Sequence, residues 1–525
     1  GQFFLDNSKE DRDNWSWIGG EKQISSAYAL LSFSWNDQVY LDLTGRNDWS
    51  SSLVYADESG DYSYFYPSIS GSWIFSETFT MPGWMSFGKL RASWARVGND
   101  TNPYEINQGY GVNTLQTESG FIYTNGFDRT LISPNLSPEQ KRSIELGADI
   151  RFFNGRLGLD FTYYKENTFK QILSVPAPTT SGVTSQMVNA GNIQNQGIEA
   201  SLNTTPIQTN DFEWNLDFHY TRNRNKIISL HEDVGDYKLL AGSPAYGNYR
   251  IGSAAYIGGD YGVLLSDILP ATNDNGEKIL NWDNTSRSAY YKRSGDVQRI
   301  GSIQPDFVGS VSNSFRYKNW NFSFLIDGRF GGDVASFTNR YGTAWGYMET
   351  STDNLDAEHG GMTWTSQYPD TQGRTYDDGV IPEGVFADGT EIQGPDGNVH
   401  DVSGMSYQEA YDQGYVEPSH ASAHTYWNHS WGAGVITDNW FYELNYLALR
   451  NVGINYTLPA SFARSIGFQS MSVGLKARNV LYLYNSSPND MHPEGFRGNQ
   501  SDYSYFERTP QPYSRTISLR LNVGF

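Results

Sequence analysis

The sequence contains no cysteine among its 525 residues. Disulfide frameworks, thiolate metal sites and cysteine nucleophiles are therefore excluded. Charged residues are also scarce, at 18% of the chain, against about 25% in an average globular protein. The 58 acidic residues outnumber the 37 lysines and arginines, giving a net charge of −21. This balance argues against a nucleic-acid partner, because phosphate binding requires clustered basic side chains.

Long apolar runs are missing as well. No segment approaches the ~20 apolar residues of a membrane-spanning helix, and the mean hydropathy is −0.56. A spanning β-strand needs only about 9–11 residues of alternating character, so this value does not exclude a membrane barrel. The first residues, GQFFLDNSKE, lack a basic segment followed by an apolar one, so we expect the chain to begin after a signal sequence.

Catalytic signatures are absent too. The chain has no G-x-S-x-G, no P-loop and no H-E-x-x-H, so we expect no enzyme and no cofactor. His424 and His429 lie five residues apart in HTYWNH, within a long predicted loop, and this spacing alone is a weak indication of a metal. The segment NDNGEK at 273–278 lacks the flanking carboxylates of a calcium loop and is predicted to be a turn. No metal site is expected.

Aromatic residues are abundant, at 15% of the chain, and many lie in segments that alternate with period two. The C-terminal TISLRLNVGF places Ile517, Leu519 and Leu521 on one face of a strand. Leu43 and Asp42 likewise fall on opposite faces of VYLDLTGR. Such segments predict strands near 24–35, 38–46, 62–76, 86–97, 141–153, 156–165, 195–204, 211–223, 307–317, 320–331, 443–457, 470–483 and 513–525, with a partial strand near Phe3.

The connections between these strands alternate between short and long without a break. Short ones include 36–37, the Asn-Gly pair at 154–155 and Lys-Asn at 318–319, whereas 224–306 and 332–442 are very long. In an outer-membrane barrel, short turns face the periplasm and long loops face outside. The alternation therefore predicts an all-β transmembrane antiparallel β-barrel portion of about 13–14 strands. A soluble β-sandwich has no reason to place every long loop at one end.

Several blocks, in order along the chain, resemble the SusC/RagA family of TonB-dependent outer-membrane transporters. They are SPNLSPEQKRSIELGADIRFFNGRLGLDFTYYKENT (133–168), NAGNIQNQGIEASL (189–202), GSIQPDFVGSVSNSFRYKNWNFSF (301–324), YLALRNVGINYTLP (446–459), VGLKARNVLYLYN (473–485) and the terminal Phe525. The long loops match least. The Asp-Pro-Glu of the family stands here as Asp490-Met491-His492-Pro493-Glu494, which leaves its usual role open.

The resemblance implies an outer-membrane barrel of about 22 strands, filled by an N-terminal plug. It also implies a Bacteroidota source, energy supplied through TonB, a SusD-like lipoprotein lid, contact with lipid and lipopolysaccharide, and import of oligosaccharides. Peptide import by the same architecture is the alternative. Residues 1–525 are then expected to be the C-terminal part of the barrel, without plug, TonB box or first strands. Phe525 is implied to be a signal for barrel insertion.

The loop 332–442 is the predicted location of cargo contacts. It is rich in aromatic residues, which stack on sugar rings while neighbouring amides and carboxylates bind hydroxyl groups. The proposed substrate-binding residues are Trp345, Tyr347, Trp364, Tyr426, Trp427 and Trp431. Packing within the loop or against a lid protein is the alternative role.

A second class of function also fits the composition, namely a secreted β-rich glycan-binding protein or glycosidase. Such a protein would be monodisperse in buffer without detergent, whereas a barrel would not.

Overall fold

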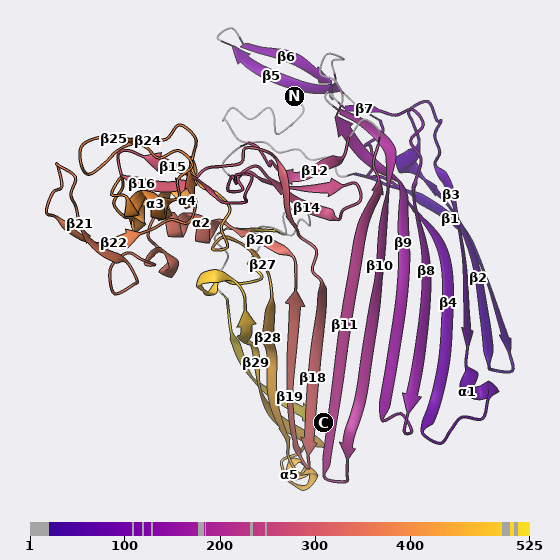
Figure 1. The fold of residues 1–525 in the computed structure, drawn as a ribbon. Coiled ribbons are helices and arrows are strands. Elements are labelled where there is room, and N and C mark those ends of the chain that lie inside the picture. Colours follow the sequence, from indigo (N-terminus) through magenta and orange to yellow (C-terminus); the bar gives the residue numbers. More distant parts are fainter. Residues whose placement is uncertain are drawn as a thin grey trace.

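One large sheet, antiparallel along its whole path, dominates the computed structural model of the protein (Figure 1). The structure describes residues 20–107, 110–117, 120–127, 130–176, 183, 185–231, 235–246, 249–495, 505–508 and 513–525. The predicted strand near Phe3 lies outside these residues. In spatial order the strands are β1 (Ile24–Trp35), β2 (Val39–Ser50), β3 (Ser63–Trp73), β4 (Met85–Asn99), β8 (Glu139–Phe152), β9 (Leu157–Pro176), β10 (Ser185–Gln208), β11 (Phe212–Ser229), β18 (Phe307–Tyr317), β19 (Trp320–Phe330), β28 (Tyr446–Thr457), β29 (Ser470–Asn485) and β31 (Thr516–Gly524).

All the predicted full strands are present, and their register aligns one apolar and one polar face. A row of apolar residues crosses neighbouring strands through Leu31, Leu43, Ile69, Trp94 and Ile144. The adjacent row is polar and runs through Ser32, Asp42, Ser70, Ser93 and Glu145. The prediction that Leu43 and Asp42 face opposite ways is therefore confirmed.

Short turns join the strands at the end of the sheet that also holds the C-terminus (Figure 1). The turn at 318–319 has the predicted two residues, with Lys318 at φ 51°. The turn after β8 is longer than predicted, because Phe153, Asn154 and Gly155 all take positive φ before β9 begins. Asn and Gly accept this backbone conformation at low cost, which explains why they occupy the turn.

One predicted long loop is wrong. The connection expected at 166–194 shrinks to 177–184, because β9 and β10 continue far beyond their predicted ends. The two strands stay paired there, with Leu173 opposite Val188 and Val175 opposite Gln186. Lys170 and Gly191 take positive φ where the pairing is interrupted. The irregularity breaks the period-two alternation of the sequence, so the alternation does not predict that the strands continue.

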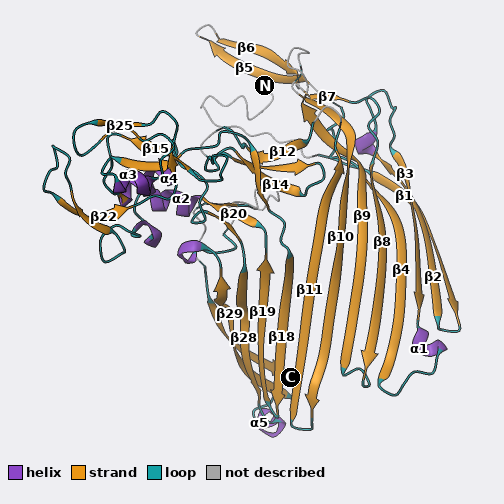
Figure 2. Cartoon of the chain, viewed as in Figure 1, coloured by secondary structure: helices purple, strands orange, loops and turns teal. Residues whose placement is uncertain are grey.

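The long connections build a folded cap at the other end of the main sheet, drawn with short strands, helices and teal loops in Figure 2. Its strands are β12 (Tyr237–Gly242), β13 (Ile251–Tyr256), β14 (Tyr261–Ser266), β15 (Ile279–Asp283), β16 (Ser288–Tyr291), β17 (Gln298–Ser302), β20 (Asp333–Ser336), β21 (Met362–Thr365), β22 (Thr375–Val380), β23 (Val385–Phe386), β24 (Glu391–Gln393), β25 (Val399–Asp401), β26 (Ser419–His420), β27 (Phe441–Glu443) and β30 (Phe506–Glu507). Nearby lie β5 (Tyr110–Thr117), β6 (Gly120–Phe127) and β7 (Thr130–Ile132), and β7 pairs with β10.

The helices are short. They are α1 (Phe75–Thr78) and α5 (Ala460–Ser465) at the short turns, α2 (Phe337–Ala344), α3 (Tyr407–Asp412) and α4 (Ala421–His429) in the cap, and 3₁₀ turns at Ser51–Leu53, Glu349–Ser351 and Pro488–Asp490. Within the described ranges, no helix has the length and apolar character needed to cross a membrane.

The cap has hydrophobic cores that join different connections. One core contains Ile251 and Ile303 from the connection before β18, Phe337 and Trp440 from the connection after β19, and Phe506 from the connection before β31. Another core packs Leu280 and Ala289 against Phe386 and Tyr407. The 332–442 segment is thus one part of a shared structure and does not fold as an independent loop.

We predict that Leu43→Arg destabilises the intact protein by about 2–4 kcal/mol, because a charged side chain near the middle of a lipid-facing strand is costly. Asp42→Asn, the matched change on the polar face, should leave the unfolding free energy nearly unchanged. Denaturant titrations in lipid vesicles measure both values. Equal losses would mean that the two faces have been assigned incorrectly.

The arrangement of turns and cap also predicts accessibility from outside the cell. Cysteines introduced at Asn275 or Asp388, both exposed in the cap, should react with an impermeant maleimide on whole cells. A cysteine at Gly155 should react only after the cells are broken. The chain has no native cysteine to give background labelling. Labelling at 155 but not in the cap would reverse the orientation.

Candidate functional site

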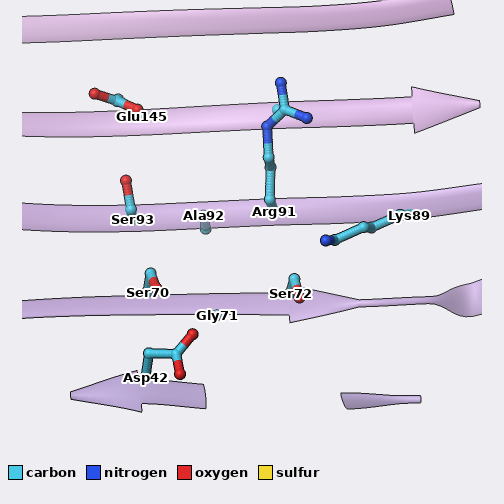
Figure 3. Close-up of a pocket in the computed structure, with 10 residues that line it drawn as sticks. Asp42, Ser70, Gly71, Ser72, Lys89, Arg91, Ala92, Ser93 and Glu145 are labelled. Atoms are coloured by element: carbon cyan, nitrogen blue, oxygen red, sulfur yellow. The ribbon is translucent and has the colours of Figure 1, made fainter. Parts of the chain in front are cut away.

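The polar face of the sheet carries a shallow groove across four neighbouring strands (Figure 3). Its lining includes Asp42 of β2, Ser70 and Ser72 of β3, Lys89, Arg91 and Ser93 of β4, and Glu145 of β8. Charges of both signs and hydroxyl groups require solvation, which a water-filled barrel interior provides and lipid does not. This face therefore suits the passage of a polar molecule.

Arg91 reaches across β8 to β9 because a glycine stands opposite it. Gly147 pairs with Arg91, and a Cβ at this position would overlap the arginine side chain. The guanidinium donates to the two carboxylate oxygens of Asp160 at 2.7 and 2.8 Å and to the hydroxyl of Thr162 at 2.6 Å. Exposed pairs of this kind contribute at most about 1 kcal/mol, so the contact orients charge more than it stabilises the sheet.

A second charged cluster lies at the cap end of β28 and centres on Arg450. The pairing of β28 with β19 skips residue 450, which is therefore bulged relative to β19, and the pairing with β29 is also irregular at this point. A bulge redirects the side chain it carries. Arg450 Nε donates to Asp327 of β19 at 2.5 Å, and the terminal nitrogens donate to the two carboxylate oxygens of Glu494 at 2.6 and 2.8 Å.

Glu494 belongs to the segment whose role the sequence left open, and here it anchors the connection after β29 to the sheet. Tyr482 and Tyr446 also donate hydroxyl hydrogen bonds to its carboxylate, at 2.8 and 3.2 Å. Burial acts to raise the pKa of Glu494, but hydrogen bonds from Arg450 and Tyr482 outweigh burial and hold this pKa below its ordinary value. The carboxylate is therefore ionised at neutral pH.

Exposed aromatic residues gather on the cap around Tyr341 of α2. The ring of Trp345 stacks on Tyr341 with centroids 5.6 Å apart, and the ring of Trp431 lies 5.7 Å from Tyr341. Trp345 is 59% exposed and Trp431 is 51% exposed. Tyr341 in turn packs on Phe337 of the buried core, 6.1 Å away. We call Tyr341, Trp345 and Trp431 the aromatic patch, because they present ring surface to solvent from a rigid base.

Two of the other predicted residues pack within the cap instead. Trp364 stacks on Tyr376 at 5.1 Å, and its indole nitrogen donates to Glu417 at 3.2 Å. Trp427 stacks on Tyr290 at 5.5 Å. These contacts correspond to the alternative role of packing within the loop.

The remaining predicted residues are exposed. Tyr347 follows Trp345 by two residues and is largely exposed, and Tyr426 remains partly exposed with its ring edge toward Trp427. Phe525 is 83% exposed at the turn end of the sheet, where its ring meets Phe468 edge-on at 5.2 Å. Its role as an insertion signal stays a prediction.

The histidines considered as metal ligands are engaged in the cap. His424 donates from Nδ1 to the carbonyl of Ala289 at 2.7 Å, and burial lowers its pKa. Burial also lowers the pKa of His429, to about 4. The segment 273–278 forms the predicted turn, in which the side-chain oxygen of Asn273 accepts backbone hydrogen bonds within the turn.

The sequence did contain a signal for the Arg450 cluster, which the prediction missed. In YLALRNVGINYT the apolar residues Leu447 and Leu449 occupy odd positions, whereas Val452 and Ile454 occupy even ones. Such a change of parity within one strand marks a bulge between the two halves. The partner Glu494 has no comparable signal, because it lies in a connection without periodicity.

Comparison with known proteins now identifies the fold. The family described as "TonB dependent receptor-like, beta-barrel" matches residues 3–302, more than half of the chain. This chain belongs to the TonB-dependent receptor family. The family consists of outer-membrane transport proteins, so the chain belongs to the bacterial outer membrane. The alternative of a secreted glycosidase or adhesin is thereby removed.

Several relatives are similar over long stretches. The TonB-dependent receptor P26 of Formosa agariphila is 31% identical over 341 residues, covering 61% of this chain and 33% of that protein. The TonB-dependent receptor SusC of Bacteroides thetaiotaomicron is 27% identical over 329 residues, covering 58% of this chain and 31% of that protein. The solved RagAB peptide transporter has a similar fold, with a TM-score of 0.64 at 19% identity, covering 96% of this chain and 47% of the solved one. The resemblance to the SusC/RagA family is thereby confirmed, and the chain spans about a third to a half of these relatives.

We predict that Arg450→Gln loosens the connection after β29, because it removes the shared cation between Asp327 and Glu494. Lost charged hydrogen bonds are worth about 1–3 kcal/mol, so amide hydrogen exchange in 486–495 and in β30 should accelerate while exchange in β8 to β10 stays unchanged. Arg46→Gln, which removes an exposed arginine paired with Asp48, is the control. Protection unchanged in 486–495 would contradict the anchoring role.

The same contact should weaken in acid. Because the folded pKa of Glu494 lies below its ordinary value, the stabilisation is complete above the ordinary carboxyl pKa of about 4.3 and is lost as the pH falls through the folded value. The difference in exchange between the native protein and Arg450→Gln should therefore disappear at low pH.

Proposed function

We propose that the intact protein imports oligosaccharides across the outer membrane, with the aromatic patch of the cap as a first contact for cargo. The observation that carries this proposal is the exposure of Trp345 and Trp431 around Tyr341, on a cap that stands at one end of a polar-faced sheet. Ring faces of tryptophan and tyrosine bind the apolar faces of sugars, and the patch is held by the cap core before cargo arrives.

A peptide is the rival cargo. The fold is similar to that of the RagAB peptide transporter, but an identity of 19% does not transfer its cargo to this chain. The similarity to SusC does not favour either cargo, because the name of that protein states no substrate. We favour a saccharide because two exposed indole rings flank one tyrosine, whereas extended peptides are usually held by backbone hydrogen bonds to a strand edge.

The same proposal includes partners that act on the intact protein. A SusD-like surface lipoprotein would cover the cap, and TonB would supply energy through a plug and TonB box that lie elsewhere in the protein. In that arrangement residues 1–525 form a C-terminal portion of the barrel, in contact with lipid and lipopolysaccharide. Cargo released from the cap would then meet the polar face. There Arg91, Asp160 and their neighbours would form hydrogen bonds with the cargo but would not catalyse a reaction.

We predict that the double substitution Trp345→Ala and Trp431→Ala lowers uptake of the cognate oligosaccharide by about tenfold or more, because central aromatic contacts dominate binding energy. Surface abundance should not change, since both side chains are more than half exposed. Growth on the oligosaccharide and uptake of a labelled form measure the effect. Tyr104→Ala, an exposed aromatic in the connection between β4 and β5, is the control. Normal uptake by the double variant would remove the patch from the cargo path.

A further inference from the structure

Positive charge collects beside the aromatic patch, in a chain whose net charge is −21. The guanidinium of Arg340 lies 5.7 Å from the ring of Tyr341, and that of Arg508 lies 5.7 Å from the ring of Tyr249. Tyr249 itself packs 4.2 Å from Phe337, the core residue beneath the patch. Three different connections of the barrel supply these residues, so the sequence alone does not bring them together.

Arg293 is a cation directly beside the exposed Trp431. Its Nη2 donates to the backbone carbonyl of Trp431 at 2.8 Å, and its Nε donates to the carbonyl of Gly434 at 2.9 Å. Both acceptors are uncharged, and Nη1 has no acceptor among the described residues. The guanidinium is thus fixed next to Trp431 by two backbone carbonyls, with no ion-pair partner among the described residues.

The acidic residues nearby are already engaged. Asp267 is paired with Arg250, whose Nε donates to it at 2.7 Å. Glu507 accepts from the hydroxyls of Ser336 and Thr338 at the start of α2. Within the described part of the chain, neither Arg293 nor Arg508 forms an ion pair.

A buried arginine adds to the positive field below the patch. Arg340 is fully buried, and its Nη2 has no hydrogen-bond partner within the described residues. Its Nε donates to the carbonyl of His429 at 3.2 Å, and its guanidinium stacks over Trp440 at 4.5 Å. A buried cation without an acid partner is costly, and the cost falls when an anion binds at the surface above it. Burial and the nearby charge of Arg250 lower the pKa of Arg293, while the carboxylate of Asp267 acts in the opposite direction.

We propose that the aromatic patch and Arg293 form a binding site for acidic oligosaccharides, with a carboxylate or sulfate group on Arg293 and an adjacent sugar ring on Trp431 or Trp345. The guanidinium is planar and its donors are arranged as a fork, which matches carboxylate and sulfate oxygens. Arg508 lies over the ring of Tyr249 and extends the positive surface for a second acidic group. This inference rests on the proposed function and adds the chemical class of the cargo.

The test uses the intact transporter purified in detergent and measures binding by calorimetry. The probes are oligomers of galacturonate, of mannuronate and of sulfated galactose, each compared with its carboxyl-reduced or desulfated counterpart. At least one acidic oligomer should bind about tenfold more tightly than its neutral counterpart, and this advantage should shrink between about 50 and 500 mM salt. Equal affinity within every pair would overturn the proposal.

Substitutions locate the effect. Arg293→Gln should reduce the affinity for the acidic oligomer to that for the neutral counterpart, and Arg293→Lys should restore part of it. Arg287→Gln is the matched control, since Arg287 is a cap arginine that also stacks on a tyrosine, Tyr368, at 4.0 Å but is already paired with Asp370. An unchanged affinity in Arg293→Gln would overturn the assignment. If that variant does not fold, Arg508→Gln, which alters an exposed side chain, should still weaken acidic oligomers selectively.

Two further outcomes separate this proposal from the function on which it rests. Tight binding of hexaglutamate, without binding of any acidic oligosaccharide, would overturn the saccharide class and favour peptide cargo. If the Trp345→Ala and Trp431→Ala variant loses oligosaccharide uptake while Arg293→Gln imports every acidic oligomer as well as the native protein does, the proposed function stands and the acidic class falls.

Discussion

Backbone hydrogen bonding is the constraint on which the rest of the structure depends. In lipid, the N–H and C=O groups of a strand have no water to bind, so each strand must be paired along its whole length by its neighbours. Continuous pairing fixes the register, and the register in turn decides which side chains face lipid and which face inward. Leu43 and Asp42 are therefore assigned their environments by the hydrogen bonds of β1, β2 and β3, before any side-chain contact is made.

Functional groups arise where this regular pairing is modified. Gly147 keeps the backbone pairing but removes a side chain, which lets Arg91 cross one strand to reach Asp160. At Arg450 the pairing itself skips a residue, and the freed side chain binds acids on either side of β28. The two devices differ in cost. A glycine opposite a long side chain leaves the ladder intact, whereas a bulge gives up a pairing position and recovers part of the loss through charged hydrogen bonds.

The main sheet was predictable from the sequence because its information is local. Period-two alternation over about ten residues identifies each strand, and turn residues such as Asn154 and Gly155 mark the ends. The cap has no such period. Arg293 and Trp431 are 138 positions apart, and the core beneath them takes residues from three connections. The prediction of six cargo-binding aromatic residues depends on residue type and loop alone, which cannot distinguish Trp431, exposed beside Tyr341, from Trp427, packed on Tyr290.

The cap and the sheet are joined by specific contacts. The connection after β29 is held to the sheet by Glu494 and Arg450, and further along it β30 pairs with β20 directly before α2. Helix α2 carries Tyr341, the base of the aromatic patch. The patch is therefore linked through α2 and β30 to the connection that the charged cluster on β28 holds. That cluster is made of a few strong hydrogen bonds and not of a broad apolar interface, so the loss of one side chain is enough to release the connection from β28.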